Sequence, residues 1–273
     1  MNRLARPLAY EKRMSDYMSE RTYLDENEGR SLTSRRGFLT GSAAALAGGA
    51  LMAVPGAAFA HKTAEPPTDV DMLNFALTLE HLEAVFYTQG LKKFDAKDFS
   101  EFFKKNRAYR EQGINGTLEG EEVRMEFTIL REHEQTHVDT LKSVIRSLGG
   151  KPVPECRYNF EKTAFTSVGK FVAVARVLEN TGVTAYDGAI GHIENAKLLT
   201  AGATIATVEA RHAAYLNLIN GVQPFPRAFD KAVAPRKICG MVEPFIVSCP
   251  EPYGPYKSLA DLCGRVPNTV REL

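Results

Sequence analysis

The chain has 273 residues, of which 44% are hydrophobic and 25% charged, a composition that fits one globular domain with additional segments. Its 34 Lys and Arg residues nearly balance 33 Asp and Glu residues, so the formal net charge is only +1. Because the chain also lacks a basic stripe interleaved with aromatic residues, we expect no nucleic-acid partner.

The N-terminal region, residues 1–60, has the features of an export signal. A polar, Arg-rich stretch leads into Ser34-Arg35-Arg36-Gly37-Phe38-Leu39, which resembles a twin-arginine signal, and a small-residue apolar region follows. The sequence Ala58-Phe59-Ala60 then forms an Ala-x-Ala cleavage pattern, with His61 as the expected start of the mature chain.

A membrane anchor is the alternative for this region. Its apolar run of about fifteen residues is short of the ~20 that a spanning helix needs, and Pro55 breaks it. We therefore expect removal of the signal, no stable membrane insertion, and a periplasmic or secreted protein that uses the twin-arginine pathway. Such signals resemble those of proteins that are exported already folded, often with a metal installed.

The first predicted helix spans residues 70–90, with Asp69 as its N-cap and Gly90 at its end. One face carries an apolar stripe that is interrupted by Glu80 and Glu83 and ends at Tyr87. Glu80 is therefore a candidate metal ligand, and Glu83 is either an additional ligand or a neighbour that supports one. His81 falls with Asn74 and Thr78 on the least apolar side, which predicts a surface position or a supporting role and no metal ligation.

The second predicted helix spans residues 119–148 and is separated from the first by an insertion. A short helix near 97–110 is expected to pack on the bundle within that insertion. The apolar stripe of the second helix is interrupted by Glu134 and His137, three residues apart and on the same face. Burial of a carboxylate and an imidazole costs several kcal/mol, so such groups are usually paired or bound to a metal.

Two further helices repeat this arrangement. The third is predicted over 164–187 and carries an inward Glu179, and the fourth is predicted over 202–220 after a broken, Gly-rich stretch. The fourth contains a second Glu-x-x-His, Glu209 and His212, on an apolar face. Tyr87 and Tyr186 each lie seven residues after a lone glutamate, which hints at a duplicated helix pair.

Single and double sites thus alternate along four helices. One Glu-x-x-His occurs often by chance as a surface ion pair, but two of them on apolar faces, each preceded by a helix with an inward glutamate, match the ligand set of a di-metal four-helix bundle. We expect two metal ions, held by Glu80, Glu134, His137, Glu179, Glu209 and His212.

These residues carry a family resemblance. The chain resembles the ferritin-like superfamily of di-iron carboxylate proteins, and in particular secreted ferritin-like or desiccation-related proteins. The resemblance covers about residues 70–248 and is carried by 74–87, both Glu-x-x-His segments and Pro224-Phe225-Pro226-Arg227-Ala228-Phe229-Asp230. It implies an all-α, ferritin-like four-helix bundle, which we place at residues 61–221.

A Pro-rich C-terminal extension, residues 222–273, follows the bundle. It cannot form long helices, yet it is too apolar for a disordered tail, so we expect it to wrap the bundle. The four cysteines are candidates for disulfides in an exported protein, and they allow three full pairings. They are Cys156, Cys239, Cys249 and Cys263.

Carboxylates and imidazoles without thiolates suit iron best and manganese next. The first hypothesis is therefore a non-haem di-iron oxidoreductase that acts on O2, peroxide or Fe(II), with Tyr87 and Tyr186 as electron or hydrogen-bond donors; both tyrosines can equally be core aromatics. The alternative is a stress-related protein whose metal site is structural. A cage-forming iron store is disfavoured by the insertion and the Pro-rich tail, although an oligomer is possible.

Overall fold

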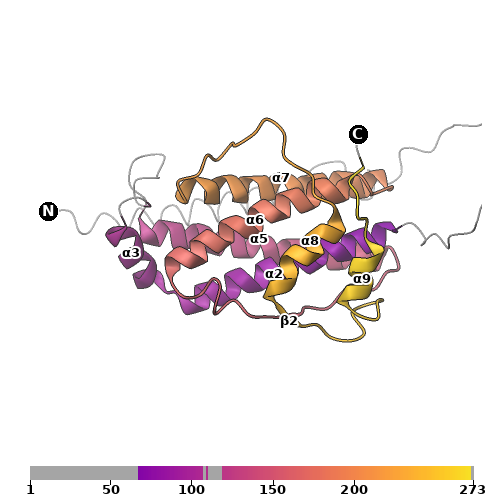
Figure 1. The fold of residues 1–273 in the computed structure, drawn as a ribbon, viewed down its shortest axis with the longest axis horizontal. Coiled ribbons are helices and arrows are strands. Elements are labelled where there is room, and N and C mark those ends of the chain that lie inside the picture. The colour runs from indigo at the N-terminus through magenta and orange to yellow at the C-terminus, as the bar shows by residue number, and fades with distance from the viewer. Residues whose placement is uncertain (1–66, 107–108, 110–118, 272–273) are drawn as a thin grey trace, which may run out of the picture. The chain divides into compact units, whose positions relative to one another are not determined.

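Four long helices contain all of the candidate metal ligands. They are α2 (Asp69–Lys93), α5 (Gly120–Ser147), α6 (Val168–Ile190) and α7 (Ala196–Ile219). The computed structural model describes residues 67–106, 109 and 119–271 (Figure 1). The expected export signal and the cleavage point before His61 lie outside these residues. Within the described residues, no helix has both the length and the apolar character that a membrane span requires.

The helices pack as two pairs, α2 with α5 and α6 with α7, and the pairs meet through α2 and α6. The mostly helical structure confirms the all-α prediction. The helix α3 (Ala96–Lys105) begins within the insertion, packs on α5 and α6, and buries Phe99 and Phe103. The Phe99 ring extends an aromatic cluster around Phe171, and the Phe103 ring packs on Phe102 and Tyr109.

The helix boundaries follow local capping chemistry. Thr68 caps α2 in a reciprocal capping box with Asp71, so the prediction of Asp69 as the N-cap is wrong. The Asp69 carboxylate instead accepts hydrogen bonds from the backbone N–H groups of Glu194 and Asn195, immediately before α7. It therefore ties the start of the first long helix to the start of the last.

The break before the fourth helix falls at residues 191–195, so the predicted start of that helix at residue 202 is wrong. The helix α7 begins at Ala196, where the Asn195 side chain caps it, and continues through Gly202 without interruption. A glycine costs about 1 kcal/mol in a helix interior, which is too little to stop a helix that packs along its whole length against a neighbour. The third helix is shifted by a few residues and ends at Ile190.

The C-terminal extension packs on two of the long helices. Its short helices α8 (Pro235–Val242) and α9 (Leu259–Arg265) contact α6 and α2, respectively. Between them, the 3₁₀ turn η1 (Glu243–Phe245) leads into β2 (Ile246–Ser248), which pairs antiparallel with β1 (Arg157–Tyr158). Disulfides Cys156–Cys249 and Cys239–Cys263 fix the pairing that the sequence left open.

The extension also covers the polar side of α2. The Tyr256 hydroxyl donates to Asp71 Oδ1 at 2.8 Å, and the Tyr253 hydroxyl lies 3.1 Å from Thr78 Oγ1. Asn74 donates to Tyr256 and accepts from the backbone N–H of Val153. The side of this helix with the fewest apolar residues is thus an interior polar face, on which Asp71, Asn74 and Thr78 form hydrogen bonds with distant segments.

Candidate metal centre

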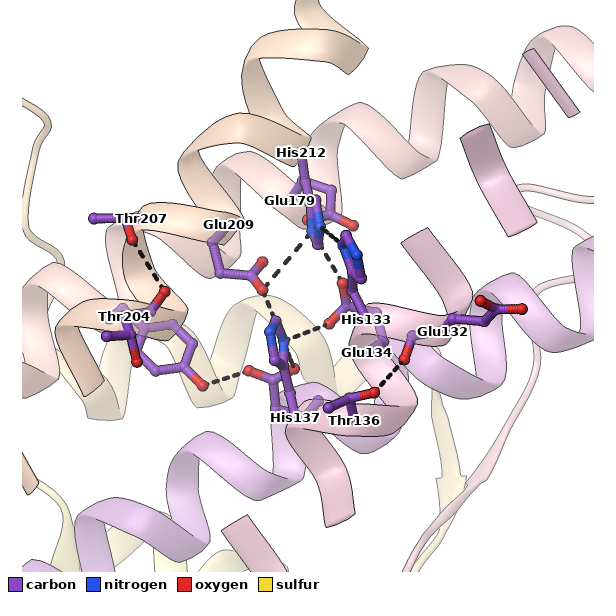
Figure 2. Close-up of polar contacts among 12 residues, drawn as sticks. Glu132, His133, Glu134, Thr136, His137, Glu179, Thr204, Thr207, Glu209 and His212 are labelled. Atoms are coloured by element: carbon purple, nitrogen blue, oxygen red, sulfur yellow. Dashed lines mark hydrogen bonds and ion pairs between the residues drawn. The ribbon is translucent and has the colours of Figure 1, made fainter. Parts of the chain in front are cut away.

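The structure brings the six predicted ligands together inside the bundle. Figure 2 shows Glu134, His137, Glu179, Glu209 and His212 directed at one another. Their donor atoms form two groups, and within each group all donor atoms lie within 4.8 Å of one another. One group contains Glu80, Glu134, His137 and Glu209, and the other contains Glu134, Glu179, Glu209 and His212. Glu134 and Glu209 belong to both groups, and all four glutamates are 0% exposed.

Each imidazole directs its Nδ1 atom at three carboxylates. His137 Nδ1 lies 3.1 Å from Glu80 Oε2, 3.3 Å from Glu134 Oε2 and 3.2 Å from Glu209 Oε1. His212 Nδ1 lies 3.0 Å from Glu134 Oε1, 3.1 Å from Glu179 Oε2 and 3.9 Å from Glu209 Oε1. One N–H group cannot serve three acceptors, so each half of the cluster has more buried anionic oxygens than hydrogens to pair with them.

Several carboxylate oxygens confirm this excess. Glu134 Oε1 and both carboxylate oxygens of Glu209 are buried and accept no hydrogen bond of good geometry within the described residues. Glu134 Oε1 and Glu209 Oε1 each have a histidine Nδ1 nearby, whereas Glu209 Oε2 forms no ion pair with any described residue. Unpaired buried oxygens are costly, and a cation on each side of the shared glutamates would satisfy them. Four carboxylates match the charge of two divalent ions. The residues present therefore fit a metal centre, in which Glu134 and Glu209 belong to both groups of donor atoms and would serve either one.

The pKa values of the cluster are shifted because its carboxylates crowd negative charge into a buried volume. Burial, and then the charge of Glu179, raises the pKa of Glu134 to about 7, and burial with the neighbouring carboxylates holds the pKa of Glu209 well above its usual range. Burial alone would lower the pKa of His212, but the charge of Glu179 and the hydrogen bonds to carboxylates raise it to about 11. Protons and cations thus compete for the same oxygens.

Two tyrosines link the helices that carry the lone glutamates. Tyr87 on α2 donates to Glu179 Oε1 on α6 at 2.6 Å, and Tyr186 on α6 donates to Glu80 Oε1 on α2. Burial raises the pKa of both phenols well above the usual value, so both remain protonated donors. These two reciprocal hydrogen bonds are related by an approximate twofold symmetry, as a duplicated helix pair would produce. Each bond orients one carboxylate oxygen of a lone glutamate.

Glu83 breaks this symmetry. It is absent from both groups of donor atoms, but it is buried beside them, and burial with the charges of Glu179 and Glu209 raises its pKa well above the usual value. The matching position on α6, three residues after Glu179, is Gly182. A Cβ atom at Gly182 would lie 3.4 Å from Glu83 Oε1 and 3.1 Å from Glu209 Oε2, so the glycine makes room for both carboxylates.

Sequence reasoning missed His133. Its Nδ1 atom lies 2.9 Å from His212 Nε2, and the two rings stack with centroids 5.2 Å apart and an interplanar angle of 14°. Figure 2 shows the two imidazoles side by side next to the carboxylates. The sequence did offer one indication of its position. His133 precedes His137 by one helical turn, which places both side chains near the same face of the helix. The half-site of His212 therefore has a supporting imidazole.

His81, by contrast, takes no part in the cluster. That it has no ligand role stays a prediction, but a surface position is wrong because it is only 2% exposed. Its Nε2 atom has no hydrogen-bond partner among the described residues, and Nδ1 lies 4.0 Å from Glu155. Burial, together with the positive charge of Lys142, lowers its pKa to about 4, so it is a neutral interior histidine at neutral pH.

A four-helix bundle with two overlapping Glu and His half-sites has the architecture of carboxylate-bridged di-metal proteins. The chain belongs to the ferritin-like domain family, whose sequence model matches residues 68–221. It is also similar to Protein rds1 of Schizosaccharomyces pombe (strain 972 / ATCC 24843), with 25% identity over 182 residues, which are 67% of this chain. The match spans only 40% of that relative's length.

Proposed function

We propose that the protein is a di-iron oxidoreductase that acts on O2, peroxide or Fe(II), with manganese as the alternative metal. The observation that carries this proposal is the sharing of Glu134 and Glu209 between two half-sites, because shared carboxylates hold two ions close enough to act on one small oxidant. Glu80 with His137 would complete one half-site, and Glu179 with His212 the other. Two redox-active ions held there would supply electrons for reduction of the oxidant.

The chain's own residues would set the conditions for this reaction. Tyr87 and Tyr186 hold the Oε1 atoms of Glu179 and Glu80, respectively, by hydrogen bonds. The Oε2 atoms of the same two glutamates are directed at His212 and His137. The apolar packing around the site excludes bulk water, which strengthens electrostatic interactions within it. Because their hydroxyls are already placed on ligands, both tyrosines are positioned to transfer a proton or an electron to the centre.

The test combines metal content with Fe(II) oxidation. Protein purified without added metal and loaded anaerobically with Fe(II) should bind two irons per chain and oxidise Fe(II) in air faster than buffer does. Glu134→Ala and Glu209→Ala should lose both properties, because each removes a ligand of both half-sites. Glu121→Ala, at an exposed position of the same helix as Glu134, is the control and should behave as wild type.

A structural metal site in a stress-related protein is the second candidate. The complete burial of the four glutamates favours it, since buried metal clusters stabilise a fold without any substrate. In that case two ions would bind and raise the thermal midpoint, but Fe(II) oxidation would equal that of Glu134→Ala. Absence of bound metal in every preparation would contradict both candidates.

We further propose export through the twin-arginine pathway, which the segment Ser34-Arg35-Arg36-Gly37-Phe38-Leu39 supports. The expected product in the exported fraction is a chain that starts at His61, as measured by intact mass. Replacement of Arg35 and Arg36 by Lys should abolish export, and unchanged export of that variant would contradict the proposal.

A further inference from the structure

A second candidate site lies along α6 and α7, and none of the six candidate metal ligands lines it. It is a pocket of about 520 Å³ formed by α6, α7 and the segment 222–231 that follows α7. Figure 1 shows this segment arching away from α7 before it reaches α8. The volume falls in the range of small-molecule sites, which is roughly 300–1,000 Å³.

The charge of the pocket is strongly one-sided. Arg176 from α6, Arg211 from α7, and Arg227 and Lys231 from the segment line it, against a single acid, Asp230. Four cations and one anion give the lining a net charge of +3, whereas the whole chain carries +1. No side chain of these four cations forms an ion pair or a hydrogen bond within the described residues. Arginine side chains form their strongest contacts with carboxylates and phosphates, so several of them lining one pocket favour an anionic ligand.

The remaining lining is mostly apolar, and its polar groups are one pair of amides and the hydroxyl of Thr184. Asn180 and Asn217 exchange hydrogen bonds of 3.0 and 3.3 Å across α6 and α7. Phe225 and the prolines beside it form the apolar wall on the segment side, and Phe225 is 77% exposed. An exposed aromatic ring beside unpaired guanidinium groups favours a ligand with an apolar or aromatic body as well as a negative charge.

We propose that this pocket binds a small organic anion, a carboxylate or a phosphate ester attached to an apolar or aromatic group. The cations from both helices and from the segment line the same pocket, so an anionic ligand held there would be in a positive environment. The apolar body of the ligand would cover Phe225. The proposal is independent of the metal centre, because none of the six candidate ligands lines the pocket.

The probe is 8-anilinonaphthalene-1-sulfonate, which carries an anion on an aromatic body and fluoresces when it leaves water. Titrated into the full-length protein, it should bind at one saturable site and weaken as salt is raised. The double variant Arg176→Gln/Arg211→Gln should bind it at least tenfold more weakly, because each guanidinium supplies a charge-assisted contact. Phe225→Ser should also weaken binding, but with an unchanged dependence on salt.

The control is Lys104→Gln/Lys162→Gln, which removes two exposed cations outside the pocket and should bind as wild type does. Circular dichroism and metal content of every variant should match wild type, which separates this test from the metal centre. Competition with benzoate and with inorganic phosphate distinguishes the two anion sources, and displacement by either supports the proposal. Absence of saturable binding, or equal affinity of the Arg176→Gln/Arg211→Gln and control variants, would overturn it.

Discussion

The contact between His133 and His212 can fix the tautomer of the His212 ring. When His212 Nδ1 binds a cation, its proton must reside on Nε2, which lies 2.9 Å from His133 Nδ1. His133 can accept that hydrogen bond and thereby hold the ring in its binding orientation. Partners of this kind behind a metal ligand typically account for a 10–100-fold difference in metal affinity.

We expect His133→Ala to weaken one of the two metal-binding steps about 10–100-fold and to leave the other nearly unchanged. The reason is that His212 belongs to only one of the two half-sites. Anaerobic Fe(II) titration followed by calorimetry measures both steps. His133→Gln, whose amide oxygen can accept the same hydrogen bond, should restore most of the affinity. Equal weakening of both steps would contradict the assignment.

His81 predicts a dependence of stability on pH. Its folded pKa of about 4 lies below the ordinary value of 6.5, so the unfolded chain binds a proton between these limits and the folded chain does not. The free energy of unfolding should therefore fall as the pH is lowered from 6.5 to 4, by at most ~3 kcal/mol from this residue. Above pH 6.5 the residue has no such effect.

Urea denaturation of metal-free wild type and His81→Gln across this pH range tests the prediction. The glutamine cannot be protonated, so the difference in unfolding free energy between the two proteins should shift in favour of the variant as the pH falls. If the difference stays constant from pH 7 to pH 4, His81 is protonated in the folded protein and its buried environment does not exclude the charge.

At the scale of elements, replacement of a helical glycine by alanine should have opposite effects at Gly182 and at Gly202. Gly182→Ala should weaken metal binding at least tenfold, because its Cβ would lie only 3.1 Å from Glu209 Oε2 and Glu209 is shared by both half-sites. Gly202→Ala should instead stabilise the protein by up to ~1 kcal/mol, since nothing lies within 4 Å of its Cβ and alanine favours the helix.

Metal content by mass spectrometry and unfolding in urea test the two glycine variants together. Gly202→Ala is the matched control for the effect of an alanine in a long bundle helix, and it should keep full metal content. Retention of both ions by Gly182→Ala with unchanged affinity would contradict the space-making role of that glycine.

Helix positions and faces could be predicted at this scale more reliably than helix ends. Glu134 and His137 interrupt a stripe with a spacing of three and four, and this local period alone indicates that both side chains face inward. The start of α7 could not be predicted from its glycines, because packing against α6 outweighs the local cost of Gly202. The insertion helix was predictable in place, since it begins after a capping Asp95 and carries buried aromatic residues.

At the scale of the whole molecule, the disulfides attach the C-terminal extension to the bundle. Cys156–Cys249 closes a loop of 93 residues and Cys239–Cys263 one of 24. A longer loop loses more entropy in the unfolded chain when it is closed, which gives about 4–5 kcal/mol for the first and about 3 kcal/mol for the second on the chain-entropy account. The first disulfide should therefore stabilise the protein more.

The variants Cys156→Ala/Cys249→Ala and Cys239→Ala/Cys263→Ala test this order by urea denaturation under oxidising conditions. Each should lower the free energy of unfolding, and the first should lower it more, by about 1 kcal/mol. The first should also expose the polar side of α2, because Tyr253 and Tyr256 follow Cys249 directly. The reverse order of stability would show that the extension stays in place without its longer-range covalent link.

The sequence by itself determined the helical class and the inward orientation of the six ligand candidates, because both depend on a period of 3.6 residues along one segment. The sequence also indicated that the ligands are six. Two Glu-x-x-His pairs and two further inward glutamates match the ligand set of a di-metal four-helix bundle. Only the tertiary structure decided which carboxylates are shared, that Tyr186 donates to Glu80 from 106 residues away, and that His133 supports His212. Those contacts depend on how helices pack against one another, which local periodicity does not encode. For the same reason, the sequence did not predict the burial of His81 or the pocket between α6, α7 and residues 222–231. The surroundings of both come from segments distant in the chain.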